Sequence, residues 1–451
     1  MSVAEPEHLT LEDLLGFSGP DAPPEEVIRS CVHCGFCLPA CPTYRETLRE
    51  RSSPRGRIWL IKAVSEGRLD IRDETFQEEM NLCLNCRACE AVCPSGVQYG
   101  ELVESARAQI AALDPPPAQR RALQAAVFEG VFASPKRYRA AGAALRLYQR
   151  SGAQELTRRS GVLRALGLEA QERMLPEMSD RFLTPGTEHW PAQGERRGTV
   201  ALLAGCIMST AYADTHRATA RVLARNGFDV VVPRGQGCCG ALAVHAGDFK
   251  RGRRLARTNV DAFDVPDVDA VLSNAAGCGA AMREYDFLLR NDPAYARRAA
   301  RFVESVQDVT EFLANAGLTA VPGRLDVTVT YQEPCHLAHA QRVTKQPREL
   351  LQAIPGLKLI EMAESALCCG SAGIYNVLQP EMSNALLERK LANAAATDAP
   401  IIVTANPGCL LQLQAGLQRQ GKDTEVLHIM TLLDRAYERT DDERNGRANG
   451  G

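Results

Sequence analysis

The sequence predicts a multidomain protein of mixed α+β and α/β class, with an N-terminal helical module, a helical connector and two tandem α/β domains whose sheets are mainly parallel. Three observations predict this fold class. Two compact cysteine runs lie within the first hundred residues, an Ala- and Leu-rich stretch follows, and apolar strand-like runs then alternate with amphipathic segments. A chain of 451 residues is long enough for two or three domains with separate cores.

Breaks in composition separate the parts. A helix that starts near Gly100 should end at the prolines of residues 115–117, and a Pro- and Gly-rich loop at residues 184–194 should end the connector. The polar residues after Thr440 predict disorder. The expected parts are an N-terminal segment (1–24), the cysteine-rich module (25–113), the connector (114–197), the first α/β domain (198–322), the second α/β domain (323–439) and a disordered tail (440–451).

Each cysteine run has the spacing C-x2-C-x2-C-x3-C-P, once at residues 31–42 and once at residues 83–94. Thiolates at this spacing hold a [4Fe–4S] cluster, and in two-cluster ferredoxins the fourth cysteine of each run binds the other cluster. The alternative is zinc, because C-x2-C also suits a tetrahedral zinc site, but zinc requires neither a third C-x2 step nor the repeated proline. We therefore predict two [4Fe–4S] clusters of a ferredoxin-like module, with cluster 1 bound by Cys31, Cys34, Cys37 and Cys93 and cluster 2 bound by Cys83, Cys86, Cys89 and Cys41.

The second half of the chain repeats a four-cysteine pattern. The gaps between its cysteines are 32 and 39 residues in the first copy and 33 and 40 in the second, an agreement that indicates duplication. The two copies define CCG site 1 (Cys206, Cys238, Cys239 and Cys278) and CCG site 2 (Cys335, Cys368, Cys369 and Cys409), each named for its Cys-Cys-Gly string.

Apolar runs typical of buried strands precede these cysteines, for example residues 199–204 before Cys206 and residues 401–403 before Cys409. The carboxyl ends of parallel strands share one edge of an open α/β sheet, so the cysteines of each copy should converge there. Helix N-termini at that edge would favour an anionic, thiolate-bound cluster. Each site would then hold an additional iron–sulfur cluster or zinc; the alternative is a set of buried structural thiols.

Composition limits the function classes. Sixteen cysteines, with no apolar signal core in residues 1–24, favour reduced, metal-binding thiols in the cytoplasm over secreted disulfides. No run of about 18 apolar residues is present to span a membrane, and a net charge of −3 gives no reason to expect nucleic acid as a partner. Residues 120–164 hold ten basic and two acidic residues, which favours a solvated helical face over a docking surface for a partner subunit or anionic lipid.

Specific strings add a family resemblance over about residues 25–435. The strings are CVHCGFC at 31–37, CPTY at 41–44, PRGRI at 54–58, CPSGV at 93–97, GCCG at 237–240, CCGSAG at 368–373 and VTAN at 403–406. With two ferredoxin runs and two Cys-Cys-Gly copies, the chain resembles the iron–sulfur subunits of glycolate oxidase. These lie within a wider cysteine-rich (CCG) family that includes lactate-utilisation proteins, the small chain of anaerobic glycerol-3-phosphate dehydrogenase and the cysteine-rich chain of heterodisulfide reductase.

The resemblance implies a division of labour within a glycolate oxidase complex. FAD-binding subunits would oxidise a 2-hydroxy acid such as glycolate, and this chain would relay the electrons singly to a quinone or another membrane acceptor. No catalytic residue is expected here, and no G-x-G-x-x-G follows a predicted strand, which is consistent with FAD on a partner subunit. The implied location is the cytoplasm, with peripheral attachment to the inner face of the cell membrane.

The sequence differs from the heterodisulfide reductase chain in the number of cysteines in each half. Each half of the heterodisulfide reductase chain ends in C-x2-C and has five cysteines. Ala275 and Asn406 occupy the extra positions here, and the four remaining cysteines suit a [4Fe–4S] cube, zinc or an altered site and argue against disulfide reduction. Among neighbouring residues, His33 should tune cluster 1 through hydrogen bonds. His336 should be hydrogen-bonded in its pocket, with metal ligation or proton donation near a quinone as the alternatives.

Two other functions stay open at this point. The same relay attached to a lactate or an anaerobic glycerol-3-phosphate dehydrogenase is the second hypothesis; the strings above favour glycolate oxidase, and the identity of the partner flavoprotein would distinguish them. A zinc-stabilised scaffold without a redox role belongs to another class, and it would be colourless and contain zinc in place of iron.

Overall fold

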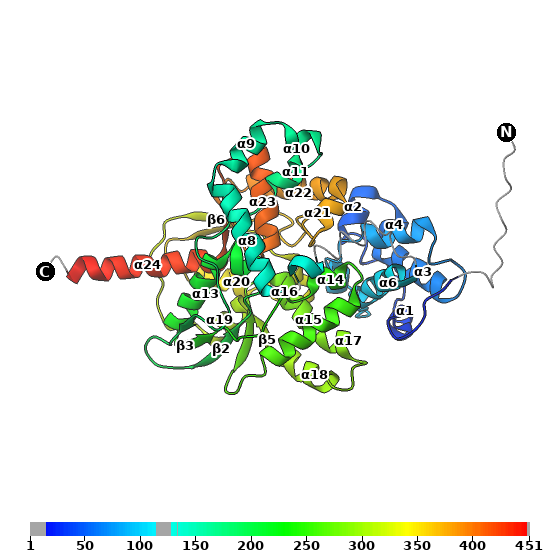
Figure 1. Cartoon of the computed structure of the whole chain (residues 1–451), viewed down its shortest axis with the longest axis horizontal. Coiled ribbons are helices and arrows are strands. Elements are labelled where there is room, and N and C mark those ends of the chain that lie inside the picture. Colours follow the sequence, from blue (N-terminus) through cyan, green and yellow to red (C-terminus); the bar gives the residue numbers. More distant parts are fainter. Residues whose placement is uncertain (1–14, 114–127, 133, 449–451) are drawn as a thin grey trace. The chain divides into compact units, whose positions relative to one another are not determined.

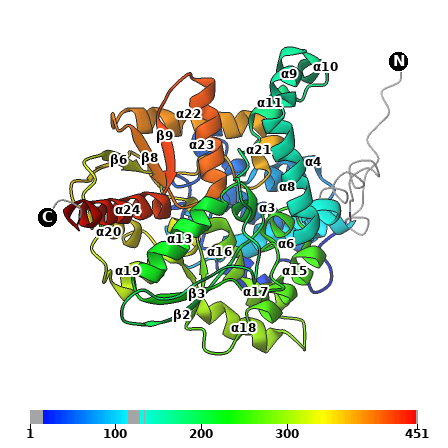
Figure 2. The same ribbon diagram turned by 60° about the vertical axis from the view of Figure 1, so that its left-hand side comes forward.

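The computed structural model describes residues 15–113, 128–132 and 134–448. The chain divides into two compact units. Unit 1 comprises Met1–Arg121 and Leu242–Phe249, and unit 2 comprises Ala122–Ala241 and Lys250–Gly451. Within the described ranges all strands belong to unit 2 (Figures 1 and 2).

Unit 1 is a helical module around a small apolar core. Phe76, Met80 and Leu102 are fully buried in this core, which α3, α4 and α6 enclose. Its helical elements are α1 (Glu25–Arg29), α2 (Pro42–Thr47), η2 (Glu50–Ser52), α3 (Pro54–Ser65), α4 (Glu74–Leu82), α5 (Ala88–Ala91) and α6 (Tyr99–Leu113). The helical ferredoxin-like module predicted from the cysteine runs is confirmed as a fold.

The start of α3 explains a glycine in the PRGRI string. The Ser53 side chain accepts a hydrogen bond from the Gly56 amide at 3.0 Å, and Pro54 occupies the first helical position, which suits a residue without an amide hydrogen. A Cβ on Gly56 would lie 2.1 Å from the carbonyl oxygen of Glu50. The close packing of η2 on α3 therefore requires glycine here.

Unit 1 also contains a segment from the middle of the chain. Leu242–Phe249, with most of α14 (Ala241–His245), belongs to unit 1, whereas the sequence prediction assigned it to the α/β domain at 198–322. Arg107 explains the difference, because its Nη1 donates a hydrogen bond to the His245 carbonyl at 3.0 Å. A Cβ on Gly247 would lie 2.5 Å from the Arg107 carbonyl oxygen, so the segment packs closely on α6.

The connector predicted for residues 114–197 is helical over much of residues 128–173, but its last part contains no helix and includes β1 (His189–Trp190). Residues 114–127 and 133 lie outside the described residues. Its main helix, α8, begins with Pro135 at the first helical position after Ser134. The connector elements are η3 (Phe128–Phe132), α8 (Pro135–Arg150), α9 (Ala153–Arg159), α10 (Val162–Ala165) and α11 (Glu169–Arg173).

The rest of unit 2 consists of two α/β halves. The first half contains β1 (His189–Trp190), β2 (Gly198–Leu202), α12 (Ile207–Thr210), α13 (Ala213–Arg225), β3 (Phe228–Val231), α15 (Phe249–Ala262), β4 (Ala270–Ser273), α16 (Ala276–Met282), α17 (Tyr285–Leu289), α18 (Ala296–Ser305), β5 (Val306–Asp308) and α19 (Val309–Ala316). The second half contains β6 (Thr328–Tyr331), η4 (His336–Ala340), α20 (Gln346–Gln352), β7 (Lys358–Glu361), α21 (Tyr375–Leu378), α22 (Pro380–Ala395), β8 (Ile401–Thr404), α23 (Pro407–Arg419), β9 (Glu425–His428) and α24 (Ile429–Ala448).

The two sheets have matching strand orders. The first is β1-β3-β2-β4-β5 and the second is β7-β6-β8-β9, so β2 to β5 correspond one by one to β6 to β9. Every pair is parallel except β1 with β3. The mainly parallel α/β halves predicted from the sequence are confirmed, and the matched orders agree with an internal duplication.

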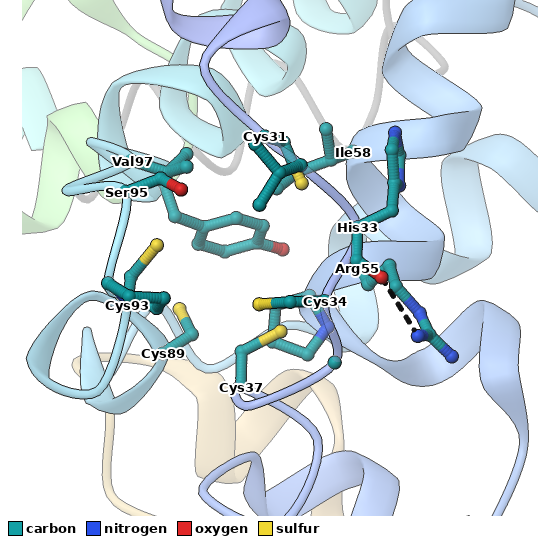
Figure 3. A pocket seen from close by; sticks show the side chains of 15 residues that line it. Cys31, His33, Cys34, Cys37, Arg55, Ile58, Cys89, Cys93, Ser95 and Val97 are labelled. Carbon is teal, nitrogen blue, oxygen red and sulfur yellow. Dashed lines mark hydrogen bonds between the residues drawn. The ribbon is translucent and has the colours of Figure 1, made fainter.

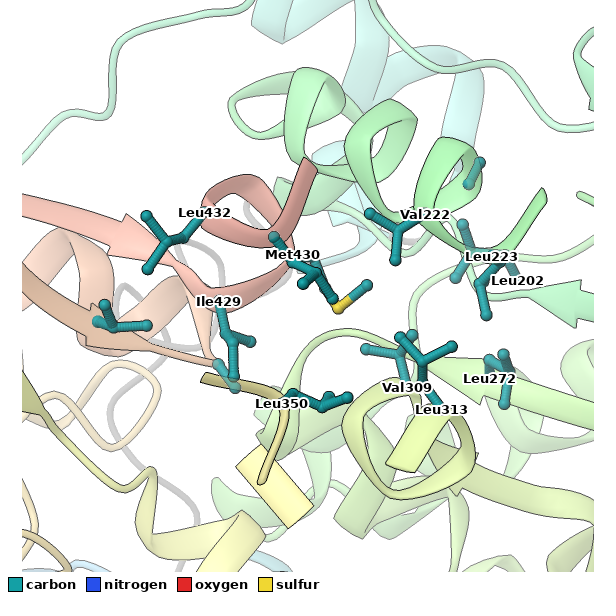
Figure 4. Packing of buried hydrophobic residues seen from close by; sticks show 14 of the residues in the cluster. Leu202, Val222, Leu223, Leu272, Val309, Leu313, Leu350, Ile429, Met430 and Leu432 are labelled. Carbon is teal, nitrogen blue, oxygen red and sulfur yellow. The ribbon is translucent and has the colours of Figure 1, made fainter. Parts of the chain in front are cut away.

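The halves share one hydrophobic core. Helix α13 packs against α24, and α19 packs against α20, so helices of one half cover those of the other. Figure 4 shows Val222 and Leu313 of the first half facing Leu350 and Met430 of the second within one buried cluster. The prediction of two tandem domains is therefore refined, because the halves form a single unit.

The C-terminal tail differs from its prediction. Helix α24 continues to Ala448, so a disordered tail at residues 440–451 is wrong for most of that range. The start of the helix is held by buried Leu433, Ala436 and Tyr437. Once such a turn is fixed, each added residue gains a backbone hydrogen bond at little further entropic cost, and polar residues continue the helix.

Candidate iron–sulfur sites

One pocket of unit 1 gathers cysteines from both runs. Its lining includes Cys31, Cys34, Cys37 and Cys93, the four residues predicted for cluster 1, together with Cys89. Figure 3 shows these side chains projecting toward one space. His33 lies in the same lining, and its carbonyl accepts a hydrogen bond from Arg55 Nη1 at 3.1 Å.

A second pocket of unit 1 gathers the other cysteines. Its lining includes Cys41, Cys83, Cys86 and Cys89, the four residues predicted for cluster 2, and all four are buried. Pro54, Cys89 and Tyr99 line both pockets, so the two pockets share a wall. The Tyr99 hydroxyl donates a hydrogen bond to Cys83 Sγ at 3.5 Å.

The first pocket is the more exposed of the two. Cys34 is exposed, and Cys31, Cys37 and Cys93 are half-buried. The apolar neighbours Val32 and Phe36 are 66% and 65% exposed. The cluster 1 cysteines therefore lie at a surface with apolar side chains, whereas the cluster 2 cysteines lie inside the module.

The donor set of each pocket fits a [4Fe–4S] cluster, which takes four thiolates. Burial raises the pKa of Cys31 and Cys89 above that of an ordinary thiol, and it raises the pKa of Cys37 to about 11. Without a positive centre these groups stay protonated at neutral pH. Binding of a metal cluster would stabilise the thiolates and release their protons.

Arg57 and Glu79 form a buried ion pair behind the cluster 2 cysteines. Their side chains are 1% and 4% exposed, and Arg57 Nη2 lies 3.2 Å from Glu79 Oε2. Arg57 also donates hydrogen bonds to the Glu79 carbonyl at 2.7 Å and to Thr43 Oγ1 at 3.0 Å. Thr43 Oγ1 lies 3.2 Å from Cys41 Sγ. The pair therefore supports a predicted cluster ligand.

Replacing Arg57 with leucine should destabilise unit 1 by about 3–5 kcal/mol, because Glu79 would keep a buried charge with only the half-exposed Arg51 as an ionic partner and the Ser52 hydroxyl as a hydrogen-bond donor. Urea unfolding of the metal-loaded protein measures the loss. The double variant R57L/E79L should recover part of it by removing the unpaired charge. A loss below about 1 kcal/mol for R57L would contradict this account of the pair.

The segment Leu242–Phe249 completes the surroundings of the cluster 2 loop. Asn85, which lies between Cys83 and Cys86, donates a hydrogen bond from Nδ2 to Glu104 Oε1 at 2.6 Å. His245 Nδ1 lies 2.9 Å from the same carboxylate oxygen. Burial opposes ionisation of Glu104, but the hydrogen bonds from His245 and Asn85 lower its pKa to about 2. The loop is therefore held by a charged, buried acceptor.

In unit 2 the four cysteines of each pattern come together after the carboxyl ends of parallel strands. In CCG site 1, hydrogen bonds from Cys206 and Cys239 hold the pKa of Cys238 well below that of an ordinary thiol, and Cys239 also bonds to Cys278. The thiols thus form a chain from the cysteine after β2 to the cysteine in α16.

CCG site 2 has the same arrangement. Cys335 Sγ lies 3.9 Å from Cys368 Sγ, and Cys369 Sγ lies 3.5 Å from Cys409 Sγ. Hydrogen bonds from Cys368 and Cys409 hold the pKa of Cys369 well below that of an ordinary thiol. His336 adjoins Cys335, and a Cβ on Gly277 would lie 3.5 Å from its Nδ1.

The connector closes one side of CCG site 1. Phe132, Tyr138 and Arg139 line a small pocket together with Cys206 and Cys238. The Tyr138 hydroxyl accepts a hydrogen bond from Thr210 Oγ1 at 3.2 Å, and burial raises its pKa. Two aromatic side chains of the connector, Phe132 and Tyr138, therefore cover part of this site.

Over the described ranges, no group of three or more His, Cys, Asp or Glu side chains has the spacing to surround a single metal ion. No described helix is long and apolar enough to cross a membrane. All sixteen cysteines are free thiols.

Some residues of these sites escaped sequence reasoning. Arg57 lies within the PRGRI string, but the string did not reveal its buried partner Glu79. His245 follows the first Cys-Cys-Gly string by five residues, and nothing in its local sequence indicates a contact with Glu104. Both contacts join residues far apart in the chain, for which local patterns carry no signal.

Comparisons with known proteins identify the family. A profile described as "4Fe-4S dicluster domain" matches residues 27–97, and one described as "Cysteine-rich domain" (CCG) matches residues 200–283 and 329–414. A third, "Glycolate oxidase iron-sulfur subunit, linker region", matches residues 119–175. Over 417 residues the chain is 43% identical to "Probable glycolate oxidase iron-sulfur subunit" of Bacillus subtilis, covering 91% of this chain and 94% of that protein. The chain belongs to the family of glycolate oxidase iron–sulfur subunits.

Two further relatives show lower identity to this chain. The "Glycolate oxidase iron-sulfur subunit" of Escherichia coli is 35% identical over 92% of this chain and 95% of its own length. "Lactate utilization protein A" of Halalkalibacterium halodurans is 29% identical, and the match covers 54% of this chain and 99% of that protein. The family resemblance predicted from the sequence is confirmed, as is a domain for two [4Fe–4S] clusters.

Proposed function

We propose that this chain is the electron-transfer subunit of a glycolate oxidase. It takes electrons from an FAD-binding partner subunit that oxidises glycolate and delivers them to a quinone or another membrane acceptor. A [4Fe–4S] cluster, when bound, takes up and releases one electron at a time. The observation that carries the proposal is the pair of pockets in unit 1, because the lining of each contains the four cysteines, drawn from both runs, that one cluster requires.

The proposed ligands follow from these linings. Cys31, Cys34, Cys37 and Cys93 would bind cluster 1, and Cys41, Cys83, Cys86 and Cys89 would bind cluster 2. The shared wall of Pro54, Cys89 and Tyr99 supports electron exchange between the two, because it leaves little protein between the pockets. The CCG sites would each hold a further iron–sulfur cluster, for which four clustered thiols are a suitable donor set.

Electrons are proposed to enter at cluster 1. Its ligand Cys34 is exposed, and the neighbouring Val32 and Phe36 offer an apolar surface to a partner. Every cluster 2 cysteine is buried.

Glycolate is favoured over lactate or glycerol 3-phosphate as the substrate of the partner. The linker profile at residues 119–175 is specific to glycolate oxidase subunits by its description, and the lactate utilisation relative matches only about half of this chain. Purification with the co-expressed flavoprotein, followed by assay with each substrate, tests this choice. Reduction of the iron–sulfur chain by lactate alone would refute it.

Peripheral attachment to the inner face of the membrane is proposed through the connector. Helices α9 and α10 bury none of their side chains, and Figure 2 shows them at the outer edge of unit 2. Leu156 and Leu166 are 72% and 65% exposed beside basic side chains such as Arg159. Binding to anionic vesicles should weaken with salt and in L156S/L166S. Equal binding to neutral vesicles would contradict the proposal.

Metal analysis of protein purified without oxygen tests the cluster content. About 12–16 irons per chain would support clusters in both units, and about eight would restrict them to unit 1. Cys239→Ser should remove about four irons from unit 2 and leave both ferredoxin-like clusters. Zinc without iron would instead support the scaffold alternative.

A further inference from the structure

The two CCG sites meet at a common wall inside unit 2. Helix α16, which carries Cys278, packs against η4, which follows Cys335. The Ala276 amide donates a hydrogen bond to the Ala405 carbonyl at 3.3 Å. The residues just before the last cysteine of each half therefore lie side by side.

Asn406 lies in this wall, and its side chain forms hydrogen bonds with one residue of each half. Its Nδ2 donates a hydrogen bond to Cys409 Sγ at 3.5 Å, and its Oδ1 accepts one from the Gly277 amide at 3.2 Å. The accepted bond fixes the orientation of the amide, because the carbonyl oxygen must face Gly277. The amino group then points to the sulfur of CCG site 2.

The first half has no such donor at the matching position. Ala275 and Asn406 each precede the last cysteine by three residues, and each is the residue before a helix, α16 or α23. Their backbones are alike, with φ and ψ of −135° and 103° for Ala275 and −152° and 127° for Asn406. The difference between the halves at this point is one amide side chain.

A buried amine adds to the asymmetry. Lys390 is fully buried, and its Nζ donates hydrogen bonds to the carbonyls of Glu364 and Ser365 at 2.5 Å and 3.0 Å. Burial lowers the pKa of Lys390, and Cys369, Cys368 and Cys409 partly offset this effect by favouring the charged amine. Near CCG site 1, Arg139 is only half-buried, so solvent screens its charge more strongly.

We propose that Asn406, supported by Lys390, makes CCG site 2 the stronger electron acceptor of the two CCG sites and so fixes the direction of transfer between them. This rests on the proposed function, in which both sites hold iron–sulfur clusters. A hydrogen bond or a cation at a ligand sulfur offsets negative charge and favours the reduced state. Transfer of one electron from site 1 to site 2 oxidises site 1 and reduces site 2. No covalent bond forms or breaks in this step, and no proton moves.

The test is a redox titration followed by electron paramagnetic resonance on the full chain with its clusters. Cys239→Ser and Cys369→Ser assign the signals, because each removes one site. Asn406→Ala should shift the reduction equilibrium of site 2 about tenfold toward the oxidised state, or about 59 mV for one electron, and leave site 1 unchanged. Lys390→Met should shift it in the same direction.

Asn384→Ala is the matched control, because this asparagine lies on the outer face of α22 and bonds to Arg419. This substitution should leave the reduction potentials of both sites unchanged. An unchanged reduction potential of site 2 in N406A, at full iron content, would overturn the inference. A higher reduction potential at site 1 than at site 2 in the wild type would overturn it too. Iron for only two clusters in the wild type would overturn the proposed cluster content itself, and metal analysis separates that result from the other two.

Discussion

Replacing Cys86 with serine is expected to abolish electron transfer through the chain. Cys86 lies in the buried pocket that unites the cysteines proposed for cluster 2. Serine is a poor ligand for iron, and loss of a direct ligand should exceed the roughly 10–100-fold losses typical of residues that only support a ligand. Metal binding is also coupled to folding, so unit 1 should lose stability.

The measurements are iron content and reduction of the chain by its flavoprotein partner. The variant should lose about four irons and fall to background in electron delivery to the acceptor. Cys239→Ser is the matched control, since the same substitution in unit 2 should keep the iron of unit 1 and its reduction by the partner. Full iron with full electron transfer in C86S would refute the assignment of this ligand.

Acidification should destabilise unit 2 through two buried histidines. His216 and His428 are 0% and 2% exposed, and burial lowers the pKa of each to about 4. In both, Nε2 lies 2.8 Å from a carbonyl oxygen, of Ala204 or Asn274, to which it donates. Nδ1 accepts a hydrogen bond from the Asn274 amide group in His216 and from the Met430 amide in His428. Protonation would turn that acceptor into a donor facing another donor.

The sign follows from proton binding. Below pH 6.5 the unfolded histidines bind protons and the folded ones do not, so stability falls as pH drops from about 6.5 to about 4 and then levels off. Each shift corresponds to about 3 kcal/mol, and the two are not additive because both bond to Asn274. The stability of the wild type minus that of H428Q should therefore shrink as pH falls.

Comparing the variant with the wild type cancels the acid lability of the clusters, which both share. Chemical unfolding of unit 2, followed at several pH values, gives this difference. The same substitution at the exposed residue His189, H189Q, provides the control for replacing a histidine with glutamine. A constant difference for H428Q would show that His428 does not titrate on unfolding.

The sequence went far in predicting the cysteine sites because their chemistry is local. Three of the proposed ligands of each ferredoxin-like cluster lie within seven residues of each other, and the gaps around CCG sites 1 and 2 repeat to within one residue. Alternating apolar segments also predicted the parallel sheets. These features are repeated at fixed spacing, so they can be recognised without knowledge of distant contacts.

Other features depended on contacts between residues far apart in the chain. The assignment of Leu242–Phe249 to unit 1 depends on Arg107, and the support of Cys41 depends on Arg57 and Glu79. The helical extension of α24 depends on turns anchored in the core. In each case the local sequence is not sufficient to predict the structure. A contact with a residue more than 20 positions away, or the burial of a neighbouring turn, decides it.

The sequence by itself therefore determined that the chain has a domain for two [4Fe–4S] clusters, which cysteines form each repeated pattern, and the duplicated α/β architecture. Cysteine spacing and hydrophobic periodicity are properties of short segments. Only the tertiary structure decided which cysteines face solvent, which buried charges support them and that Asn406 lies between the two CCG sites. Burial and hydrogen bonding arise when distant segments pack together, and it is these that set the charge balance around each group of thiols.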